Sequence, residues 1–578
     1  MRVTRETDEA ALAAPRPTSL APEQLGFRIR RPVRWLGPVL LAATGARVAL
    51  SEQFGAYLDK RELQQALEPA RLDHSDNDEF WFDYVADVGD GFNATYSVAY
   101  MLAQRSLTVD GHELPRGQAL IMGGDQVYPT PSGQAYEDRF RGPYRAAMPT
   151  SAPDETAPTL YAVPGNHDWY DGLTAFLRVF ARKDAHVGGW RTAQTRSYFA
   201  LQLPKGWWVF AIDAQEGSYL DDPQLEYFRD KMRDEVRSGD RIILCSPNPA
   251  WVQADERPTV YDTTDYFLRR VIGQEDEEGP KKVVTVPLML SGDWHHYARY
   301  DGPERQLITA GGGGAYLYAT HQLPRKITVP PKKSIVRTAS QSDVYRLKRA
   351  YPSKLQSTAL GTGVFTRMPV RNWSFAALLG ILHAMLLLGL DNSADWIPTL
   401  PGVIMIAVMA GLTMFFAAGL TAGKRKPRHF VAGALHGAAQ IAMGVGGVFV
   451  WRMLPFDRMH RPLPDLSAFL IYAPVAALVS TEIVALYLLI VSRFGVNLNE
   501  LFAGQGIQRY KGFLRMHIAR DGTLSIYPIG LDTVRKRWKV NPNAPVHEPW
   551  ILPRKPLTPS LIEGPIVLHP SQPGAVKV

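Results

Sequence analysis

At 578 residues the chain is too long for one ordinary domain, and its hydrophobic content of 46% is ample for a buried core. A single Cys excludes an intramolecular disulfide framework and is neutral about metal binding. The 64 Lys and Arg residues outnumber the 56 Asp and Glu residues, which gives a formal charge of +8. This charge could suggest nucleic acid, but no nucleic-acid-binding motif accompanies it, and much of the excess flanks long apolar segments. Attraction to anionic lipid head groups is the simpler explanation, so we expect a lipid bilayer and no nucleic acid as partners.

Residues 1–79 form the predicted N-terminal region. Residues 1–20 contain acids and prolines and no continuous apolar core, so they do not resemble a secretory signal. The apolar patch at residues 35–46 is too short to cross a membrane and is broken by Pro38. We expect this patch at a membrane interface or beneath the domain that follows.

The next predicted domain, residues 80–330, contains strand-like apolar runs followed by short polar segments. In an α/β protein, the carboxyl ends of neighbouring strands converge on one crevice. The clearest strand-like runs are residues 119–122, 160–163, 207–212, 241–244 and 285–291. The polar segments are Asp87-Val88-Gly89, Gly124-Asp125-Gln126-Val127-Tyr128, Gly165-Asn166-His167-Asp168, Cys245-Ser246-Pro247 and Gly292-Asp293-Trp294-His295-His296-Tyr297. Their carboxylates, amide, imidazoles, phenol and thiol are chemically suited to hold metal ions.

A pair of metal ions fits this set of side chains. Two ions about 3.5–4 Å apart need a bridging carboxylate and several terminal ligands. Asp125 is the natural bridge, because the preceding glycine lets the backbone approach closely, as Gly165 does for Asn166. Oxygen and imidazole ligands together favour iron, manganese or zinc.

The polar segments resemble the motifs of the calcineurin-like metallophosphoesterase superfamily and, within it, the purple acid phosphatase pattern. That pattern comprises DxG, GDxxY, GNH followed by an acid, a strand ending in His, and GHxHxYxR. The first three motifs match here, and the fifth has its counterpart in residues 292–299. Four motifs in the right order are specific, whereas one alone would be weak. The resemblance implies a β-sandwich flanked by helices across residues 80–330.

The resemblance also implies a set of ligands and a reaction. It assigns one ion to Asp87, Tyr128 and His295, makes Asp125 the bridge, and gives Asn166 to the second ion. The ions would be iron with zinc or manganese, and the protein would hydrolyse a phosphate ester through a metal-activated water. Four further residues have roles in the reaction that the resemblance implies. His167 would protonate the leaving oxygen or bind phosphate, Asp168 would orient His167, and His296, with Arg299, is a weaker candidate for phosphate contact.

The chain departs from the family pattern at two ligands of the second ion. Cys245 stands where the family has a His at the end of the fourth strand, and Asp293 replaces the first His of the fifth motif. A thiolate and a carboxylate can bind metal, but each adds negative charge where the family has a neutral imidazole. Alternatively Asn248 supplies an amide oxygen and Cys245 is only buried. If both replacements spoil the second site, the protein would be a non-catalytic membrane-tethered binding or signalling module.

Four consecutive glycines at residues 311–314 follow another strand-like run. Their backbone amides could cradle a phosphate. A strand-closing turn that requires positive φ is the preferred interpretation, because no lysine and helix start follow as in a nucleotide-binding loop.

Four apolar stretches predict a transmembrane domain at residues 372–493, joined to the preceding domain by a linker at residues 331–371. Each stretch is long enough to cross a bilayer, which takes about 20 residues. The stretches are residues 373–390, 400–422, 430–450 and 466–492. The second loop contains Lys424, Arg425, Lys426 and Arg428, whereas the first contains Asp391 and Asp395.

The loop charges predict the orientation of the four spans. The positive-inside rule places the second loop in the cytoplasm, and therefore also both termini and the catalytic domain of an integral membrane protein. Arg452, Arg458 and Arg461 in the third loop weaken this assignment.

Four polar side chains lie within the predicted spans: His383, His436, Gln440 and Glu482. They could mark a transport or sensing pathway, which would make the protein a transporter with a regulatory domain. Hydrogen bonding between helices, helped by Gly433 and Gly437 at GxxxG spacing, is the preferred interpretation.

The chain regains soluble character after the spans. Residues 494–545 form a predicted C-terminal β segment, in which residues 513–518 and 523–529 alternate around a turn and indicate a β-hairpin. We expect this hairpin to pack on the phosphoesterase domain. The proline-rich tail, residues 546–578, is predicted to be irregular.

Overall fold

A computed structural model describes residues 16–43, 45–46, 64, 66–182, 185–214, 219–332, 342–391, 399–418, 427–458, 460 and 462–570. The described residues divide into two compact units. The first unit draws on Met1–Val33, Leu50–Ser353 and Gln508–Val578, and the second draws on Arg34–Ala49 and Lys354–Ile507. The apolar patch at residues 35–46 therefore belongs to the second unit, and the chain after the apolar helices returns to the first.

Two large sheets form the centre of the first unit. Within the described ranges, one sheet has nine strands, in the order β20-β17-β16-β1-β4-β5-β7-β6 with β21 paired to β17. The other has eight, in the order β14-β15-β12-β13-β11-β10-β9-β8. The strands are β1 (Phe80–Val85), β2 (Ser106–Val109), β3 (His112–Pro115), β4 (Ala119–Met122), β5 (Thr159–Ala162), β6 (His186–Val187), β7 (Trp190–Thr192), β8 (Phe199–Leu203), β9 (Trp207–Ala211), β10 (Arg241–Cys245), β11 (Thr285–Ser291), β12 (Tyr297–Asp301), β13 (Gln306–Ala310), β14 (Lys326–Val329), β15 (Asp343–Tyr351), β16 (Lys511–Ile518), β17 (Leu524–Leu531), β18 (Trp538–Val540), β19 (Ile551–Pro553), β20 (Ser560–Leu561) and β21 (Ile566–Leu568).

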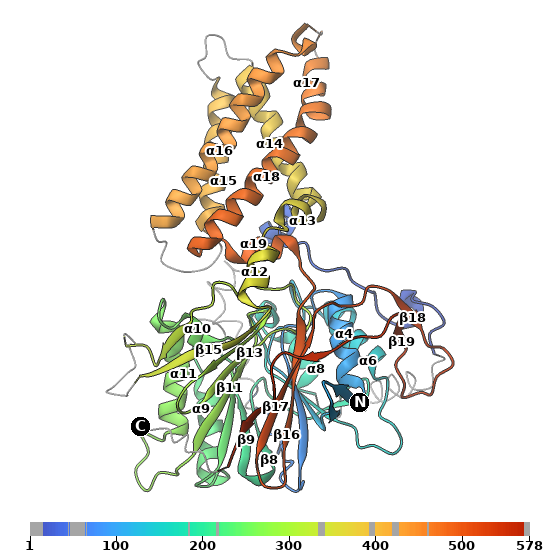
Figure 1. Cartoon of the computed structure of the whole chain (residues 1–578), viewed down its shortest axis with the longest axis vertical. Helices are drawn as coiled ribbons and strands as arrows, with labels where there is room; N and C mark the ends of the chain where they lie inside the picture. The colour runs from blue at the N-terminus through green and yellow to red at the C-terminus, as the bar shows by residue number, and fades with distance from the viewer. Residues whose placement is uncertain are drawn as a thin grey trace. The chain divides into compact units, whose positions relative to one another are not determined.

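Helices cover the outer faces of the two sheets. The helices of the first unit are α2 (Pro22–Leu25), α4 (Phe92–Ala103), α5 (Gly133–Tyr136), η2 (Glu137–Arg141), α6 (Gly142–Ala147), α7 (Asn166–Trp169), α8 (Thr174–Phe180), η3 (Pro204–Gly206), α9 (Asp222–Asp234), α10 (Ala250–Gln253), η4 (Pro258–Tyr261), α11 (Asp262–Tyr266) and η5 (Phe267–Ile272). Tyr96 of α4 shares one apolar cluster with Val85 of β1. Phe228 of α9 shares a second with Ile242 of β10. Accordingly α4 and α6 lie on one side of the strands and α9 and α11 on the other (Figure 1).

Alternate strand residues point inward, between the two sheets. Phe80, Phe82 and Tyr84 of β1 are fully buried and belong to neither outer cluster. The ring of Tyr161 on β5 lies 5.3 Å from the ring of Phe199 on β8, which joins the two sheets. Near-continuous apolar runs are typical of strands that are buried on both faces. The predicted α/β sandwich flanked by helices is thus confirmed, as are the five predicted strands to within a residue or so.

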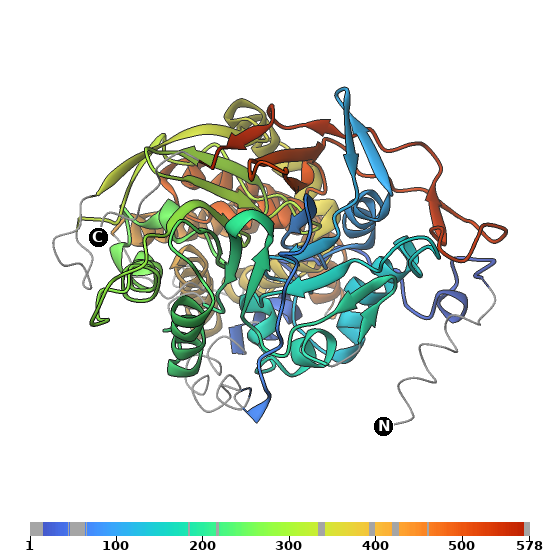
Figure 2. The same ribbon diagram turned by 90° about the horizontal axis from the view of Figure 1, so that it is seen from below.

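The predicted C-terminal hairpin is confirmed and is part of the first sheet. β16 pairs with β17 from Lys511↔Leu531 to Ile518↔Leu524. It also pairs antiparallel with β1, which lies more than 400 residues earlier in the chain. Figures 1 and 2 show these red C-terminal strands among strands from the first half of the chain. The hairpin is therefore an internal part of the first unit.

Two predictions about irregular segments were wrong. The segment 331–371, predicted as a linker, contains β15, which pairs with β12 and β14 in the second sheet. The tail at residues 546–578, predicted as irregular, supplies β19, β20 and β21. β20 and β21 are only two and three residues long and lie at the edge of the sheet. Proline-rich chain can form such strands because an edge strand leaves many N–H groups without a ladder partner.

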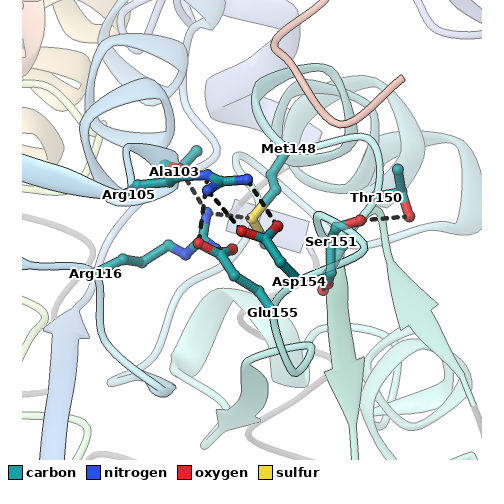
Figure 3. Close-up of polar contacts among 9 residues, drawn as sticks. Ala103, Arg105, Arg116, Met148, Thr150, Ser151, Asp154 and Glu155 are labelled. Carbon is teal, nitrogen blue, oxygen red and sulfur yellow. Dashed lines mark hydrogen bonds and ion pairs between the residues drawn. The ribbon is translucent and has the colours of Figure 1, made fainter. Parts of the chain in front are cut away.

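A surface network fixes the loop that leads into β5 (Figure 3). The guanidinium of Arg105 donates to both carboxylate oxygens of Asp154, at 3.2 and 3.1 Å. Arg116 forms an ion pair with Glu155 and also donates to the carbonyl of Ala103 at 2.9 Å. Since α4 ends at Ala103 and β5 begins at Thr159, the network ties a covering helix to the approach of a site-forming strand.

In the part of the second unit that the structure describes, four helices are long and apolar enough to cross a membrane, as predicted. They are Trp373–Asp391, Leu400–Ala418, Pro427–Arg452 and Leu463–Phe494. The helices of this unit are α12 (Lys354–Gly361), α13 (Val364–Arg371), α14 (Trp373–Asp391), α15 (Leu400–Ala418), α16 (Pro427–Arg452), η6 (Pro455–Arg458), α17 (Leu463–Ser467), η7 (Ala468–Tyr472), α18 (Ala473–Val491), η8 (Ser492–Phe494) and α19 (Leu498–Gln505). Large apolar side chains such as Leu435 and Leu470 are exposed on them, which fits a lipid environment.

Polar side chains inside the four helices bind one another. His383 of α14 contacts Gln440 of α16 at 3.0 Å, and the hydroxyl of Ser480 on α18 donates to the same Gln440 oxygen at 2.8 Å. Gln440 also contacts His436, one turn away, at 3.2 Å. This network confirms the predicted hydrogen bonding between helices. Among the described residues, Glu482 is not part of it.

Small residues let these helices approach closely. A Cβ on Gly433 would lie 2.7 Å from the sulfur of Met414, and one on Gly437 would lie 2.8 Å from the hydroxyl of Thr413. The predicted GxxxG face of α16 therefore packs on α15.

The topology prediction depends mostly on residues outside the described ranges, namely Asp395, Lys424, Arg425, Lys426 and Arg461. Of the remaining charges, Arg452 pairs with Asp391 at 3.0 Å. The cytoplasmic orientation stays a prediction.

Candidate functional site

The predicted convergence of polar segments is seen at the carboxyl ends of β1, β4, β5 and β11. β1, β4 and β5 are parallel neighbours in the first sheet. The loops after them are bonded to one another, because the N–H of Asp87 donates to the carbonyl of Gly124 at 3.0 Å and that of Val88 to the carbonyl of Asp125 at 3.1 Å. From the second sheet, the N–H of Gly292 donates to the carbonyl of Pro247 at 3.1 Å. Both sheets therefore contribute to the site.

Three aspartates at this place have left-handed backbones. Asp87, Asp125 and Asp293 have φ values of 61°, 52° and 64°. Positive φ is uncommon outside glycine and is tolerated best by Asn and Asp. Such conformations cluster at functional sites because the surrounding structure must hold them. Nothing in the sequence alone reveals this shared conformation.

Glycines let these loops approach the carboxylates, as predicted for Gly165. A Cβ on Gly165 would lie 2.1 Å from Oδ1 of Asp125, and a Cβ on Gly292 would lie 2.8 Å from Oδ2 of Asp87. Gly124 has a φ of 118°, which side chains rarely adopt. A larger residue at any of these positions would displace a carboxylate or strain the loop.

Tyr128 lies at the centre of the first predicted ligand set. Its hydroxyl oxygen is 2.8 Å from Oδ1 of Asp87, 3.1 Å from Oδ2 of Asp125 and 3.0 Å from Nε2 of His295. The His295 nitrogen is 3.6 Å from the same Asp87 oxygen. Burial, followed by the charges of Asp125 and Asp87, raises the pKa of the phenol well above its ordinary value. The metal-free phenol is therefore a protonated donor.

These donors fit a metal ion in chemistry and in spacing. Ligands bonded at about 2.0–2.2 Å lie roughly 3.0–3.5 Å apart around one ion, close to the separations of the Tyr128 oxygen, the two carboxylate oxygens and the imidazole nitrogen. No group of three His, Cys, Asp or Glu side chains suited to an ion is found in the described chain. An ion here would consequently depend on the phenol of Tyr128 and on amide oxygens.

The carboxylates of Asp87, Asp125 and Asp293 lie close enough together for their charges to repel. Asp87 is fully buried, and its Oδ2 accepts no hydrogen bond of good geometry, although the nearby N–H of Asp293 lowers its pKa slightly. Burial, reinforced by the charges of Asp125 and Asp293, raises the pKa of Asp87 well above its ordinary value. Burial also raises the pKa of Asp125. A bound cation would stabilise the charged form of both carboxylates, against the burial that raises both pKa values and the repulsion that further raises the pKa of Asp87.

Most of the second ligand set lines one small pocket. Its lining includes Asp125, Asn166, Asn248 and Asp293. Cys245 is fully buried and is not part of that lining. It alternates with Leu244, a member of the outer cluster, so its side chain lies between the sheets, where burial raises the pKa of its thiol. The geometry therefore favours the alternative in which Asn248 supplies an oxygen and Cys245 is packed.

His167 lies beside the first ligand set. Its ring centroid is 4.5 Å from that of Tyr128, and its backbone N–H donates to Oδ1 of Asp125 at 2.9 Å. Nδ1 lies 2.8 Å from the carbonyl of Pro129. A carbonyl only accepts, so Nδ1 carries a proton and Nε2 is the atom that can exchange one.

Asp168 supports the site in a different way from the one predicted. Its Oδ2 accepts from the N–H groups of Gly165 at 2.9 Å and Gln126 at 3.3 Å. Its Oδ1 accepts from the hydroxyl of Tyr136 at 2.5 Å. These bonds brace the loops that carry Asn166 and Asp125, and none of them is to the imidazole of His167.

The two weaker candidates for phosphate contact lie away from the pocket lining. His296 is fully buried, and burial lowers its pKa to about 3. The guanidinium of Arg299 binds both carboxylate oxygens of Glu563, at 3.0 and 2.6 Å. Glu563 comes from the tail that was predicted to be irregular, so this partner could not be predicted from the sequence.

The four glycines at residues 311–314 are buried and pack against the Asp87 loop. The N–H of Gly313 donates to the carbonyl of Ala86 at 2.9 Å, and a Cβ on Gly314 would lie 1.9 Å from the carbonyl oxygen of Val88. None of the four has positive φ. They therefore neither face a phosphate nor form the predicted positive-φ turn, and instead allow close packing behind the site.

Comparisons with known proteins give little further information. No protein-family model matches the chain. No curated protein matches it. A solved structure titled "GAP50 the anchor in the inner membrane complex of Plasmodium" is similar over 49% of this chain and 94% of that chain, with 13% sequence identity and a TM-score of 0.31. A likeness at this TM-score supports no conclusion about this chain's activity.

Proposed function

We propose that the first unit is a metal-dependent phosphoesterase, and that the apolar helices of the second unit anchor it in a lipid bilayer. The observation that supports this most is the position of the Tyr128 hydroxyl, in contact with Asp87, Asp125 and His295 together. A phenol, two carboxylates and an imidazole form a donor set suited to iron, zinc or manganese. Asn166, Asn248 and Asp293 would serve a second ion that shares Asp125.

Bound ions would supply a water of lowered pKa and neutralise charge on the phosphoryl oxygens. The chain's own residues would position the proton donor and protonate the leaving oxygen. Asp125 fixes the backbone of His167, and Pro129 holds its ring through Nδ1. Nε2 of His167 would then deliver a proton to the leaving oxygen of a phosphate ester.

The membrane part of the proposal depends on length and composition. Four apolar helices fit a bilayer, and the basic second loop favours a cytoplasmic position for the first unit and both termini. The hydrogen-bonded network of His383, Gln440 and Ser480 gives these helices a structural role, which makes a transporter the weaker interpretation.

The experiment that tests the proposal uses Tyr128. Purified full-length protein, loaded with iron and oxidised, should show a visible phenolate-to-metal charge-transfer band and should hydrolyse one or more of a panel of phosphate mono- and diesters. Tyr128→Phe should abolish the band, because it removes the only proposed phenol ligand. Tyr527→Phe, on β17, should retain it. Protein that binds no ion and hydrolyses no ester would instead support a non-catalytic binding module.

A further inference from the structure

A buried lysine from the C-terminal strand lies behind the candidate metal centre. Lys511 is the first residue of β16, and its exposed fraction is 0%. Within the described chain its Nζ makes no hydrogen bond. An ammonium without a partner is costly to bury, so its retention requires a compensating charge.

The strand register places Lys511 close to Asp87 along the sheet. β16 pairs antiparallel with β1 from Phe80↔Ile518 to Tyr84↔Leu514. Continued for three residues, this register brings Lys511 level with Asp87. Beyond the last pair, Tyr84↔Leu514, the backbones of β1 and β16 no longer bond to each other. The glycine run that follows β13 lies between them there.

The glycine run brings the two strands together without side chains. The N–H of Gly512 donates to the carbonyl of Gly312 at 2.9 Å. A Cβ on Gly312 would lie 2.8 Å from the nitrogen of Gly512, and a Cβ on Gly311 would lie 2.5 Å from Oδ2 of Asp87. Only backbone therefore separates the start of β16 from the carboxylate.

The charge of Lys511 acts on the site. After burial, it is the largest cause that lowers the pKa of His295. Burial lowers the pKa of Lys511 itself to about 7, against the opposing charges of Asp90 and Asp87. Asp90 is already bonded, because its two oxygens accept from the N–H groups of Val33 and Tyr316 at 2.7 and 3.1 Å. Asp90 is the larger of these two charges, and Asp87, whose Oδ2 accepts no hydrogen bond of good geometry, is the second, so the charge of Lys511 reaches a proposed metal ligand.

We propose that Lys511 is a positioning residue of the candidate metal centre, whose buried ammonium offsets the surplus carboxylate charge of Asp87, Asp125 and Asp293 and lowers the affinity of the site for cations. Asp293 adds one negative charge that acts on Asp87, and Lys511 adds one positive charge that opposes it. The inference depends on the proposed function, and it makes the segment after the apolar helices part of the site.

Mn²⁺ binding to metal-free, full-length protein at pH 6 tests this inference by calorimetry. Lys511→Met keeps the length of the side chain and removes its charge, so it should bind Mn²⁺ about tenfold more tightly. Lys511→Arg keeps the charge and should stay near wild type. Lys539→Met, on the exposed face of β18, is the matched control and should not change the dissociation constant.

Each outcome of this experiment decides a different point. An unchanged dissociation constant in Lys511→Met, with or without a lower unfolding temperature, would show that Lys511 has only a packing role. That result would overturn this inference but not the proposed function. Wild-type protein that binds no Mn²⁺ or other ion would overturn the proposed function. If Lys511→Met does not fold, Lys511→Gln is measured instead and carries the same expectation.

Discussion

Asp125→Asn is expected to remove most of the bound metal and nearly all phosphoester hydrolysis, while both units stay folded. Asp125 contacts the Tyr128 hydroxyl and also lines the pocket of Asn166 and Asp293. The substitution takes away the charge that both ions would share. Loss of a partner that only supports a ligand already lowers metal affinity by about 10–100-fold, so loss of a shared ligand should lower it at least about 100-fold.

The folded state should survive because the shapes of Asp and Asn are alike. The amide oxygen can still accept the N–H of His167, which Oδ1 of Asp125 accepts at 2.9 Å. Elemental analysis and turnover of a phosphoester measure the two effects. Asp255→Asn, at an exposed position, is the control and should leave both at wild type. Wild-type metal content and turnover in Asp125→Asn would refute the two-ion assignment.

Arg515→Met should destabilise the first unit by about 3–5 kcal/mol. Arg515 of β16 and Asp83 of β1 are both buried, and the guanidinium donates to the two carboxylate oxygens at 2.8 and 3.0 Å. It also donates to the carbonyl of Leu114 at 2.9 Å. Burial already raises the pKa of Asp83 despite the attraction of Arg515. Without the arginine, the carboxylate would remain buried without the ion pair that now binds both of its oxygens.

Denaturant unfolding of the full-length protein in detergent, followed by tryptophan fluorescence, measures this loss. Arg520→Met, in the exposed turn of the same hairpin, should change the midpoint little. The double variant Asp83→Leu with Arg515→Met should recover part of the stability, because it leaves no unpaired charge. If Arg515→Met unfolds at the wild-type midpoint, the C-terminal hairpin does not hold the sheet as described.

The parts of the fold that the sequence predicted have strong local patterns. β11 was predicted at its observed bounds because an apolar run ends in Ser291 and Gly292, and the four apolar helices follow from length and composition. β15 was missed because its burial alternates irregularly and its stability comes from pairing with β12 and β14. Pairing partners far away in the chain leave no local signal.

The site was predictable to a similar extent. The order of motifs predicted that Asp87, Asp125, Tyr128 and His295 lie together. In the structure the Tyr128 hydroxyl is 2.8–3.1 Å from the other three, and His295 is 3.6 Å from Asp87. Lys511 could not be found, because a lone lysine at the start of a strand usually lies on the surface. The packing role of the glycines at residues 311–314 could not be predicted either, because it depends on contact with β16, which follows the apolar helices in the chain.

The position of a bound ion tests the central claim most directly. Anomalous X-ray diffraction from crystals of full-length protein grown with Mn²⁺ or Zn²⁺ should show a peak bonded to Asp87, Asp125, Tyr128 and His295. A second peak should lie in the pocket of Asn166, Asn248 and Asp293 and share Asp125 with the first. Crystals whose ions lie only elsewhere, or that hold none at these residues although the dissolved sample contains metal, would contradict the account.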